Sequence, residues 1–184
     1  MSSKSILSIL LIEDNPGDVR LINELLNENT TLHHQLHVAN TLGEGCDLLK
    51  NHEFTVILLD LNLPDSSGKD TFNTVFQNAR NIPIILITGL QDVEQVLSYI
   101  KEGAQDYVIK ADLNSNLLLK TIHFAIERKK LMNELVQKTK TLQQTMNYFT
   151  DRELKMIELK KEINELLLKQ GGEKKYLRNE SINS

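Results

Sequence analysis

The sequence has little cysteine and lacks any apolar run that could span a bilayer. Cys46 is the single cysteine among 184 residues, which excludes an internal disulfide and favours a reducing compartment. The longest apolar runs, such as residues 6–12, are far shorter than the roughly 20 residues of a transmembrane helix. No cleavage signature of a signal peptide follows this run. The chain is therefore expected to be cytoplasmic and to make no membrane contact.

Charge is divided unevenly along the chain. Residues 1–127 hold eight Lys and Arg against 17 Asp and Glu, whereas residues 128–184 hold 13 against eight. In the second part the lysines alternate with glutamates along a helical pattern, which favours a solvated helix face over nucleic-acid contact. No glycine-rich fingerprint surrounds Gly17, so nucleotide binding is not expected either.

Short apolar runs alternate with amphipathic stretches through residues 1–127, which is typical of strand–helix units around a parallel sheet. The continuous hydrophobicity of these runs indicates strands that are buried on both faces. The expected strands cover residues 6–12, 35–39, 55–59, 84–87 and 106–109. The expected fold is therefore α/β, with a doubly wound five-stranded parallel sheet. Gly43 and Gly45 weaken the helix expected after the second strand.

A long helical pattern without Gly or Pro runs from Ser115 to the pair Gly171-Gly172. Its apolar residues recur at heptad spacing, which favours a two-stranded coiled coil. One seam carries Leu135, Leu142, Phe149, Met156 and Ile163, and the companion seam carries Leu131, Leu159 and Leu166 but is interrupted by Lys138, Thr145 and Arg152. The capping-box spacing of Thr150-Asp151-Arg152-Glu153 leaves open a break near Phe149, with two helices in place of one.

The chain is thus expected to have three parts. These are a globular domain over residues 1–127, a helical or coiled-coil extension over residues 128–170, and a disordered tail over residues 171–184. Nothing after residue 127 resembles a helix-turn-helix, kinase or cyclase domain, so no DNA-binding output domain is expected. The extension is expected either to form a homodimer or to dock a kinase.

Polar residues follow four of the five expected strands. Glu13 and Asp14 follow the first strand, Asp60 the third, Thr88 the fourth and Lys110 the fifth. Functional groups of a doubly wound sheet collect at the carboxyl ends of its strands, so these side chains are expected to converge. Three carboxylates at one sheet edge repel one another unless a cation neutralises them, and all-oxygen ligation favours magnesium.

These residue types suit phosphoryl transfer. That reaction needs a nucleophilic oxygen, a fixed cation and a hydroxyl or amide donor, which Asp60, Lys110 and Thr88 supply. A carboxylate nucleophile forms a short-lived acyl phosphate, and its lability suits a reversible signal. The expected role is therefore a phospho-accepting switch and not a multiple-turnover enzyme.

Four motifs, in this order, resemble those of response-regulator receiver domains of two-component systems. They are Leu10-Leu11-Ile12-Glu13-Asp14-Asn15, Leu58-Leu59-Asp60-Leu61-Asn62-Leu63-Pro64-Asp65, Ile87-Thr88-Gly89 and Gly103-Ala104-Gln105-Asp106-Tyr107-Val108-Ile109-Lys110. Four motifs at matching spacing are far more specific than one. The resemblance covers about residues 6–127 and implies a flavodoxin-like sheet of order 2-1-3-4-5.

The resemblance also implies roles for individual residues. Asp60 would take a phosphoryl group from the phosphohistidine of a histidine kinase or phosphotransfer protein. Glu13, Asp14 and Asp60 would hold magnesium, and the backbone carbonyl of Asn62 would complete the protein ligands. By the same resemblance the domain is part of a phosphorelay.

Three further residues match the family's switch. The resemblance implies that Lys110 pairs with the phosphoryl oxygens, that Thr88 moves toward them, and that Tyr107 turns inward as the hydroxyl leaves its place. The family usually follows this lysine with a proline in a cis bond, whereas Ala111 stands here. Whether the bond is cis or trans is left open by the sequence.

Other functions remain open at this point. A haloacid-dehalogenase-like aspartyl phosphatase also uses an aspartyl nucleophile, but such enzymes carry Asp-x-Asp where Asp60-Leu61-Asn62 stands here. A receiver-shaped interaction module that is never phosphorylated is a second alternative, although no acidic residue or lysine is missing. Residues 149–166 resemble linker helices of hybrid sensor kinases, so an origin as a kinase fragment is a third.

Structural roles compete with functional ones at several residues. Asp14 could cap the helix that begins near Pro16, and Asp65 could simply favour a turn. The cluster His33, His34 and His37 lacks further ligands at suitable spacing, so a metal site is not expected there.

Overall fold

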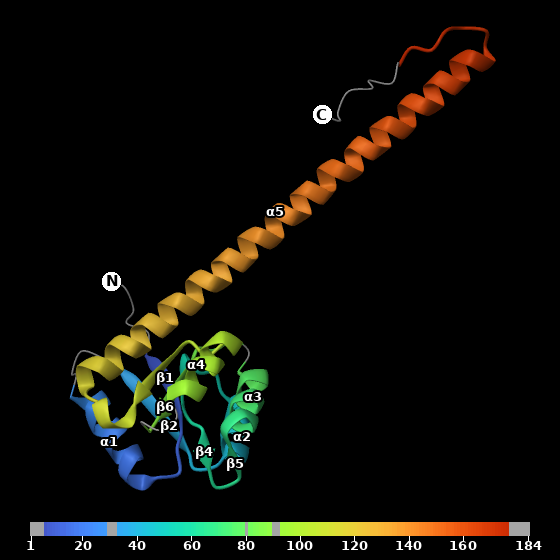
Figure 1. Cartoon of the computed structure of the whole chain (residues 1–184). Coiled ribbons are helices and arrows are strands. Elements are labelled where there is room, and N and C mark those ends of the chain that lie inside the picture. Colours follow the sequence, from blue (N-terminus) through green and yellow to red (C-terminus); the bar gives the residue numbers. More distant parts are fainter. Residues whose placement is uncertain (1–5, 29–32, 80, 90–92, 177–184) are drawn as a thin grey trace. The chain divides into compact units, whose positions relative to one another are not determined.

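The computed structural model describes residues 6–28, 33–79, 81–89 and 93–176 (Figure 1). The chain divides into two compact units, residues 1–132 and residues 133–184. No helix within the described part has the length and hydropathy needed to cross a membrane.

Five parallel strands form the sheet of the first unit in the order β2-β1-β3-β6-β7. They are β1 (Leu7–Ile12), β2 (His34–Ala39), β3 (Val56–Asp60), β6 (Ile84–Thr88) and β7 (Asp106–Ile109). Counted along the chain these five strands have the order 2-1-3-4-5, so the predicted fold and strand order are confirmed. β3 and β6 are buried along their whole length, as their unbroken apolar runs indicate.

Five α-helices occur in the described residues. They are α1 (Pro16–Asn27), α2 (Leu42–Asn51), α3 (Gly68–Asn78), α4 (Val93–Glu102) and α5 (Ser115–Lys169). α1 and the first turns of α5 cover one face of the sheet, where Ile22 and Leu118 are fully buried. α2, α3 and α4 cover the other face, where Phe72 is fully buried. Burial of such side chains contributes about 1.5 to 3 kcal/mol each, so two apolar layers hold the strand ends in place.

A short hairpin that was not predicted from the sequence follows β3. β4 (Asn62–Leu63) pairs antiparallel with β5 (Ser66–Ser67). Asp65, in the turn between them, accepts hydrogen bonds from Leu42 N at 2.9 Å and from Gly43 N at 3.0 Å. Asp65 therefore lies in a turn, as considered above, and it also caps the amino end of α2.

α2 forms a helix although two glycines lower its helix propensity. Thr41 caps it, because its Oγ1 accepts a hydrogen bond from Glu44 N at 3.1 Å. A Cβ atom on Gly45 would lie only 2.6 Å from Cδ1 of Ile12 in β1. Glycine thus permits the close approach of helix and strand, and the resulting packing outweighs the propensity cost.

α5 is one continuous helix that passes through residues 149–154 without a break. Of the two arrangements left open by the sequence, the structure has the single helix. Thr150 Oγ1 donates a hydrogen bond to Met146 O at 3.1 Å, as a threonine inside a helix does, and does not cap a new helix.

The chain turns back after α5. Gly171 has a φ of 78°, which favours glycine, and follows the helix as a terminating residue. Asn164 Oδ1 then accepts hydrogen bonds from Lys175 N and Tyr176 N, both at 3.0 Å. Residues 177–184 of the predicted tail lie outside the described residues.

Candidate functional site

The turn after β1 carries the first two acidic residues. Glu13 is buried, and its Oε1 accepts a hydrogen bond from Asn15 N at 3.1 Å, whereas Asp14 is exposed. Asn15 is the N-cap of α1, because its Oδ1 accepts from Gly17 N at 2.8 Å and Pro16 is the first helical residue. The capping role considered for Asp14 is therefore wrong.

Asp60 lies at the end of β3, beside β1, with 10% of its side chain exposed. Its Oδ1 accepts a hydrogen bond from Asn62 N, the first residue of β4, at 3.0 Å. One carboxylate oxygen from each of Glu13, Asp14 and Asp60 lies within 4.8 Å of the others. Carboxylates held this close suit a divalent cation that prefers oxygen ligands, and the buried position of Glu13 fits the same role.

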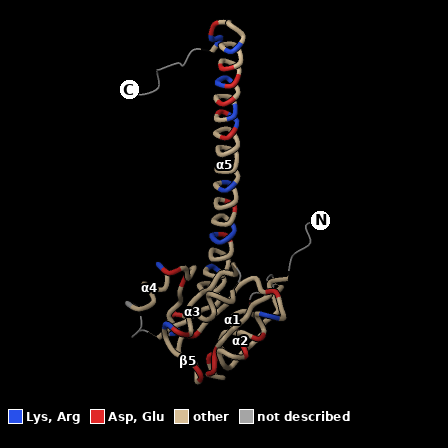
Figure 2. Tube along the Cα trace, turned by 90° about the vertical axis from the view of Figure 1, so that its right-hand side faces the viewer, with Lys and Arg blue, Asp and Glu red and all other residues tan. Residues whose placement is uncertain are grey.

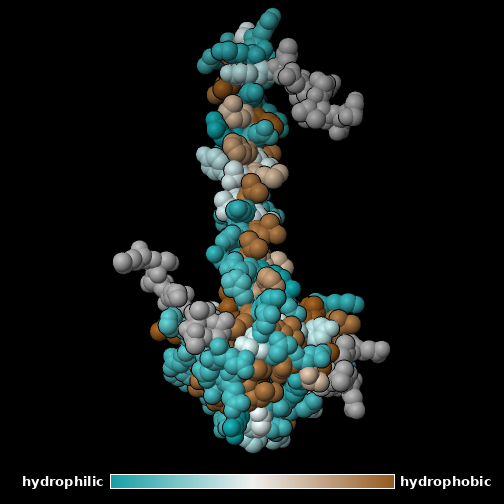
Figure 3. Space-filling model, turned by 90° about the vertical axis from the view of Figure 1, so that its left-hand side faces the viewer, coloured by the Kyte–Doolittle hydropathy of each residue, from teal (hydrophilic) through white to brown (hydrophobic). Residues whose placement is uncertain are grey.

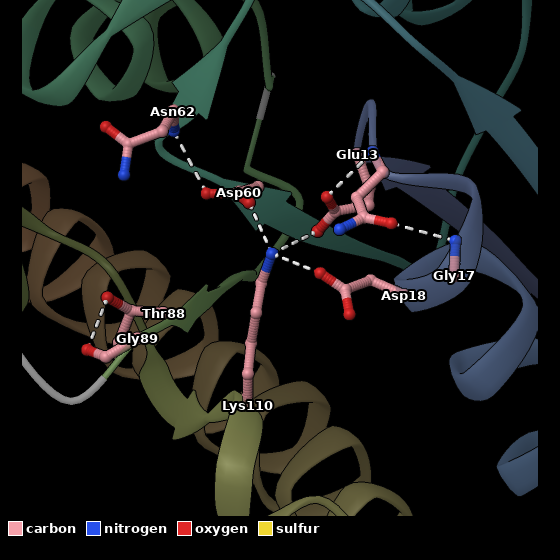
Figure 4. Close-up of polar contacts among 9 residues, drawn as sticks. Glu13, Gly17, Asp18, Asp60, Asn62, Thr88, Gly89 and Lys110 are labelled. Atoms are coloured by element: carbon pink, nitrogen blue, oxygen red, sulfur yellow. Dashed lines mark hydrogen bonds and ion pairs between the residues drawn. The ribbon is translucent and has the colours of Figure 1, made fainter.

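Lys110 supplies the positive charge at this edge of the sheet (Figure 4). Its Nζ donates hydrogen bonds to Asp60 Oδ2 at 2.6 Å and to Asp18 Oδ2 at 2.7 Å. The same Nζ lies 2.8 Å from Glu13 Oε2 and forms an ion pair with it. This oxygen accepts no hydrogen bond from any described residue. A single ammonium therefore faces three carboxylates.

Electrostatics follow from this arrangement. Burial raises the pKa of Glu13 to about 7, with the Lys110 ammonium opposing the rise and the Asp60 carboxylate adding to it. Burial alone would lower the pKa of Lys110, but its hydrogen bonds to Asp18 and Asp60 and its ion pair with Glu13 raise that pKa above its ordinary value. The lysine therefore stays charged. The carboxylates around it carry more negative charge than one ammonium can neutralise. Such an excess of negative charge favours binding of a cation.

The sequence left open whether the Lys110–Ala111 peptide bond is cis or trans. A single 3-10 turn, Lys110–Asp112, follows β7 directly. No residue of the described part has a cis peptide bond, so the Lys110–Ala111 bond is trans. The lysine thus reaches Asp60 on a trans backbone.

The two predicted switch residues lie on the neighbouring strands. Thr88 ends β6 and is buried, and its Oγ1 donates to Gly89 O at 3.3 Å (Figure 4). It lies near the end of β3, since Asp60 is paired in register with Ile87. Tyr107, in β7, is half-buried and packs against the core cluster that includes α4 side chains. The motion predicted for both residues stays a prediction.

Asp18 belongs to this site, although it was not predicted from the sequence. It lies in the first turn of α1, three residues after the cap Asn15. Acidic residues are common there because they interact favourably with the helix dipole, so nothing in the sequence sets Asp18 apart. Only the fold shows that its carboxylate reaches Lys110, 92 positions later in the chain.

The histidine cluster lies elsewhere. His33 precedes β2, while His34 and His37 belong to it. The His37 ring centroid lies 5.6 Å from that of His52 and 5.3 Å from that of Phe54, so this histidine packs within an aromatic group.

Comparison with known proteins identifies the family. The chain matches the response regulator receiver domain over residues 9–123, more than half of its length. It belongs to this family. Receiver domains are phospho-accepting signalling domains that bind Mg²⁺ at an acidic pocket and interact with histidine kinases or phosphotransfer proteins. The receiver of this chain has such an acidic group in Glu13, Asp14 and Asp60.

Relatives and solved structures agree with this assignment. The cell cycle transcriptional regulator CtrA of Caulobacter vibrioides is 30% identical over 162 residues, covering 82% of this chain and 68% of CtrA. A receiver domain from Clostridium thermocellum superposes with a TM-score of 0.60 at 26% identity, covering 69% of this chain and 99% of that one. A CheY-like receiver domain from Methanospirillum hungatei superposes with a TM-score of 0.60 at 23% identity, covering 70% and 99%, and shows the shared fold.

Proposed function

We propose that this chain is a phospho-accepting switch of a two-component phosphorelay, with Asp60 as its acceptor. The observation that carries the proposal is the hydrogen bond of 2.6 Å between Lys110 Nζ and Asp60 Oδ2, inside a group of carboxylates. An oxygen of Asp60 attacks the phosphorus of a phosphohistidine on a histidine kinase or phosphotransfer protein. The P–N bond breaks, the nitrogen leaves with its electron pair, and an acyl phosphate forms on Asp60.

The residues around Asp60 have separate tasks in this step. Asn62 N holds one carboxylate oxygen, which leaves the other to form the new bond to phosphorus. The Lys110 ammonium pairs with the negatively charged phosphoryl oxygens, and the Thr88 hydroxyl donates a hydrogen bond to them. Magnesium, when bound, offsets the negative charge of the phosphoryl group and of its ligands.

Magnesium is proposed to bind beside the Asp60 carboxylate. Glu13, Asp14 and Asp60 provide the carboxylate oxygens, and Asn62 provides its backbone carbonyl. Asp14 is exposed, and the Lys110 and Asp18 side chains are 24% and 26% exposed, which supports access of a phosphodonor from this side. Movement of Thr88 and Tyr107 would then report the phosphoryl group to protein partners.

The rest of the chain is proposed to act through protein contacts. The receiver comprises residues 1–127, the helical extension residues 128–170 and the tail residues 171–184. The extension forms a homodimer or docks a kinase, in the cytoplasm and without nucleic acid. CtrA is named a transcriptional regulator, but the described residues after the receiver here form helix and turn. In the later part of α5, residues 151–169 hold five Lys and Arg and five Asp and Glu, a mixture of signs that does not resemble a basic surface for DNA (Figure 2).

Intact-mass measurement tests the proposed acceptor. The chain is incubated with Mg²⁺ and acetyl phosphate, and one added phosphoryl group is expected. Asp60→Asn should gain none, whereas Asp112→Asn, an exposed carboxylate outside the site, should behave as wild type. An unmodified wild type would overturn the proposal in favour of an unphosphorylated interaction module. Repeated hydrolysis of p-nitrophenyl phosphate would instead favour the phosphatase alternative.

A further inference from the structure

The later half of α5 exposes an apolar seam. This C-terminal seam comprises Phe149, Arg152, Met156, Leu159, Ile163 and Leu166, at heptad positions that share one side of the helix. Its apolar members range from 38% exposed at Ile163 to 57% exposed at Phe149. Hydrophobic side chains are visible along the helix in the space-filling view (Figure 3). A row of exposed apolar side chains, interrupted here only by Arg152, is a candidate interaction site.

We propose that the C-terminal seam binds the same seam of a second copy in an antiparallel two-stranded coiled coil. Met156 then packs on the partner's Leu159, and Phe149 packs on the partner's Leu166. The two helices overlap from about residue 146 to residue 169, and the two-fold axis passes between Met156 and Leu159. This arrangement rests on the self-association proposed above and is independent of phosphorylation.

The residues inside the seam favour the antiparallel orientation. A parallel pair in register would place Arg152 against the partner's Arg152 and Lys138 against the partner's Lys138. The antiparallel pair instead places Arg152 beside the partner's Ile163, where its aliphatic stem packs and its guanidinium reaches water. Lys138 lies before the overlap and takes no part.

The charged residues that flank the seam also favour the antiparallel orientation. Glu153 and Lys160 flank one side and Lys155 and Glu162 the other, and all four are exposed. Antiparallel pairing places Glu153 near the partner's Lys160 and Lys155 near the partner's Glu162. Each contact occurs twice by symmetry, which gives four pairs of opposite charge. Parallel pairing would place Lys155 against the partner's Lys160, a contact between like charges. Flanking charges of this kind set the orientation of coiled coils.

Charge reversal distinguishes the two orientations in the full chain. Lys155→Glu should weaken the dimer roughly tenfold in sedimentation equilibrium, because it turns two attractive contacts into repulsive ones. The double variant Lys155→Glu/Glu162→Lys should restore wild-type association. In a parallel coil Lys155→Glu would strengthen the dimer instead. Lys155 is preferred to Lys160 because Lys160 Nζ also lies 5.7 Å from the centre of the Tyr176 ring.

Matched controls separate the seam from general effects of charge or hydrophobicity. Lys161→Glu makes the same charge change on the side of the helix away from the seam and should leave association unchanged. Leu159→Glu should abolish the dimer, whereas Leu154→Glu, 55% exposed but off the seam, should not. Equal effects of the paired variants would overturn the proposal.

Spin-label distances report the orientation directly. A label at Asn147→Cys, with Cys46 replaced by serine, should be about 30 Å from its copy along the axis of an antiparallel pair, given a rise of 1.5 Å per residue. A parallel pair has no axial separation at this position, and a short distance would therefore overturn the proposal, as would a monomeric wild type. Phosphorylation measured on the same samples keeps this outcome separate from the proposed role of Asp60.

Discussion

At the residue scale, the ammonium of Lys110 is shared among three acidic side chains. Asp60 and Asp18 accept its hydrogen bonds, and Glu13 lies in ion-pair contact. A phosphoryl group on Asp60 would need the same ammonium, so the other carboxylates compete with it. This competition gives Asp18 and Glu13 different, measurable consequences.

Asp18→Asn should speed phosphorylation by acetyl phosphate. The substitution removes a negative charge that holds Lys110 at 2.7 Å and that repels the incoming phosphate. A weakened hydrogen bond to a charged group corresponds to about 1 kcal/mol at a partly exposed site, or roughly fivefold in rate. Quenched samples taken over time and analysed by intact mass give the rate, with Asp112→Asn as the control. An unchanged or slower rate would show that Asp18 mainly positions the lysine.

Deprotonation of the buried Glu13 carboxyl should make the metal-free protein less stable as pH rises. Its folded pKa of about 7 lies above the ordinary value of 4.5, so the folded state binds its proton more tightly than the unfolded state. The free energy of unfolding therefore falls between these pKa values and levels off above about pH 7. The effect is on the order of 2 kcal/mol between about pH 5 and pH 8. Urea unfolding in a chelator should show this fall in wild type and lose it in Glu13→Gln; identical pH profiles would contradict it.

The site residues that lie at or directly after the end of a strand could be predicted from the sequence. Glu13, Asp14, Asp60 and Lys110 follow apolar runs, and the topology of a parallel sheet brings such ends together. Asp18 follows no strand and sits at an ordinary position of a helix. Its role depends on the length and direction of the Lys110 side chain, which no spacing rule describes.

At the element scale, α2 shows how packing overrides propensity. Gly45→Ala should destabilise the protein by about 1 to 3 kcal/mol, although alanine is the better helix former. The new Cβ would lie 2.6 Å from Cδ1 of the fully buried Ile12. Gly43→Ala is the matched control, because its Cβ meets nothing nearer than 3.7 Å. Chemical denaturation of both variants decides the point, and equal stabilities would refute the packing argument.

Strongly patterned elements were predictable, whereas elements built by local contacts were not. β3 and β6 have nearly unbroken apolar runs and are buried throughout, and the predicted order of the five strands is confirmed. The β4–β5 hairpin has only two residues in each strand, so no periodicity could reveal it. The capping-box spacing at Thr150 suggested a break in α5, but a single helix forms, in which Thr150 Oγ1 bonds to Met146 O of the same helix.

At the scale of the whole molecule, the chain combines a receiver with a long helix. The receiver supplies a charge-dense site at the carboxyl edge of its sheet, and the later part of α5 supplies an exposed apolar seam. We expect the two to be separable in experiment. Lys155→Glu should remain fully phosphorylatable by acetyl phosphate, and Asp60→Asn should sediment as wild type without a phosphodonor. Loss of phosphorylation in the first variant would show that the site depends on the dimer.

Locating the phosphoryl group tests the central account most directly. After incubation with acetyl phosphate, borohydride reduces an aspartyl phosphate to homoserine, which peptide mass mapping assigns to one position. With Mg²⁺ present we expect homoserine at position 60 alone, and with a chelator we expect almost none. Homoserine at another aspartate, or equal yield with and without the metal, would contradict the claim that a cation beside Lys110 lets Asp60 attack phosphorus.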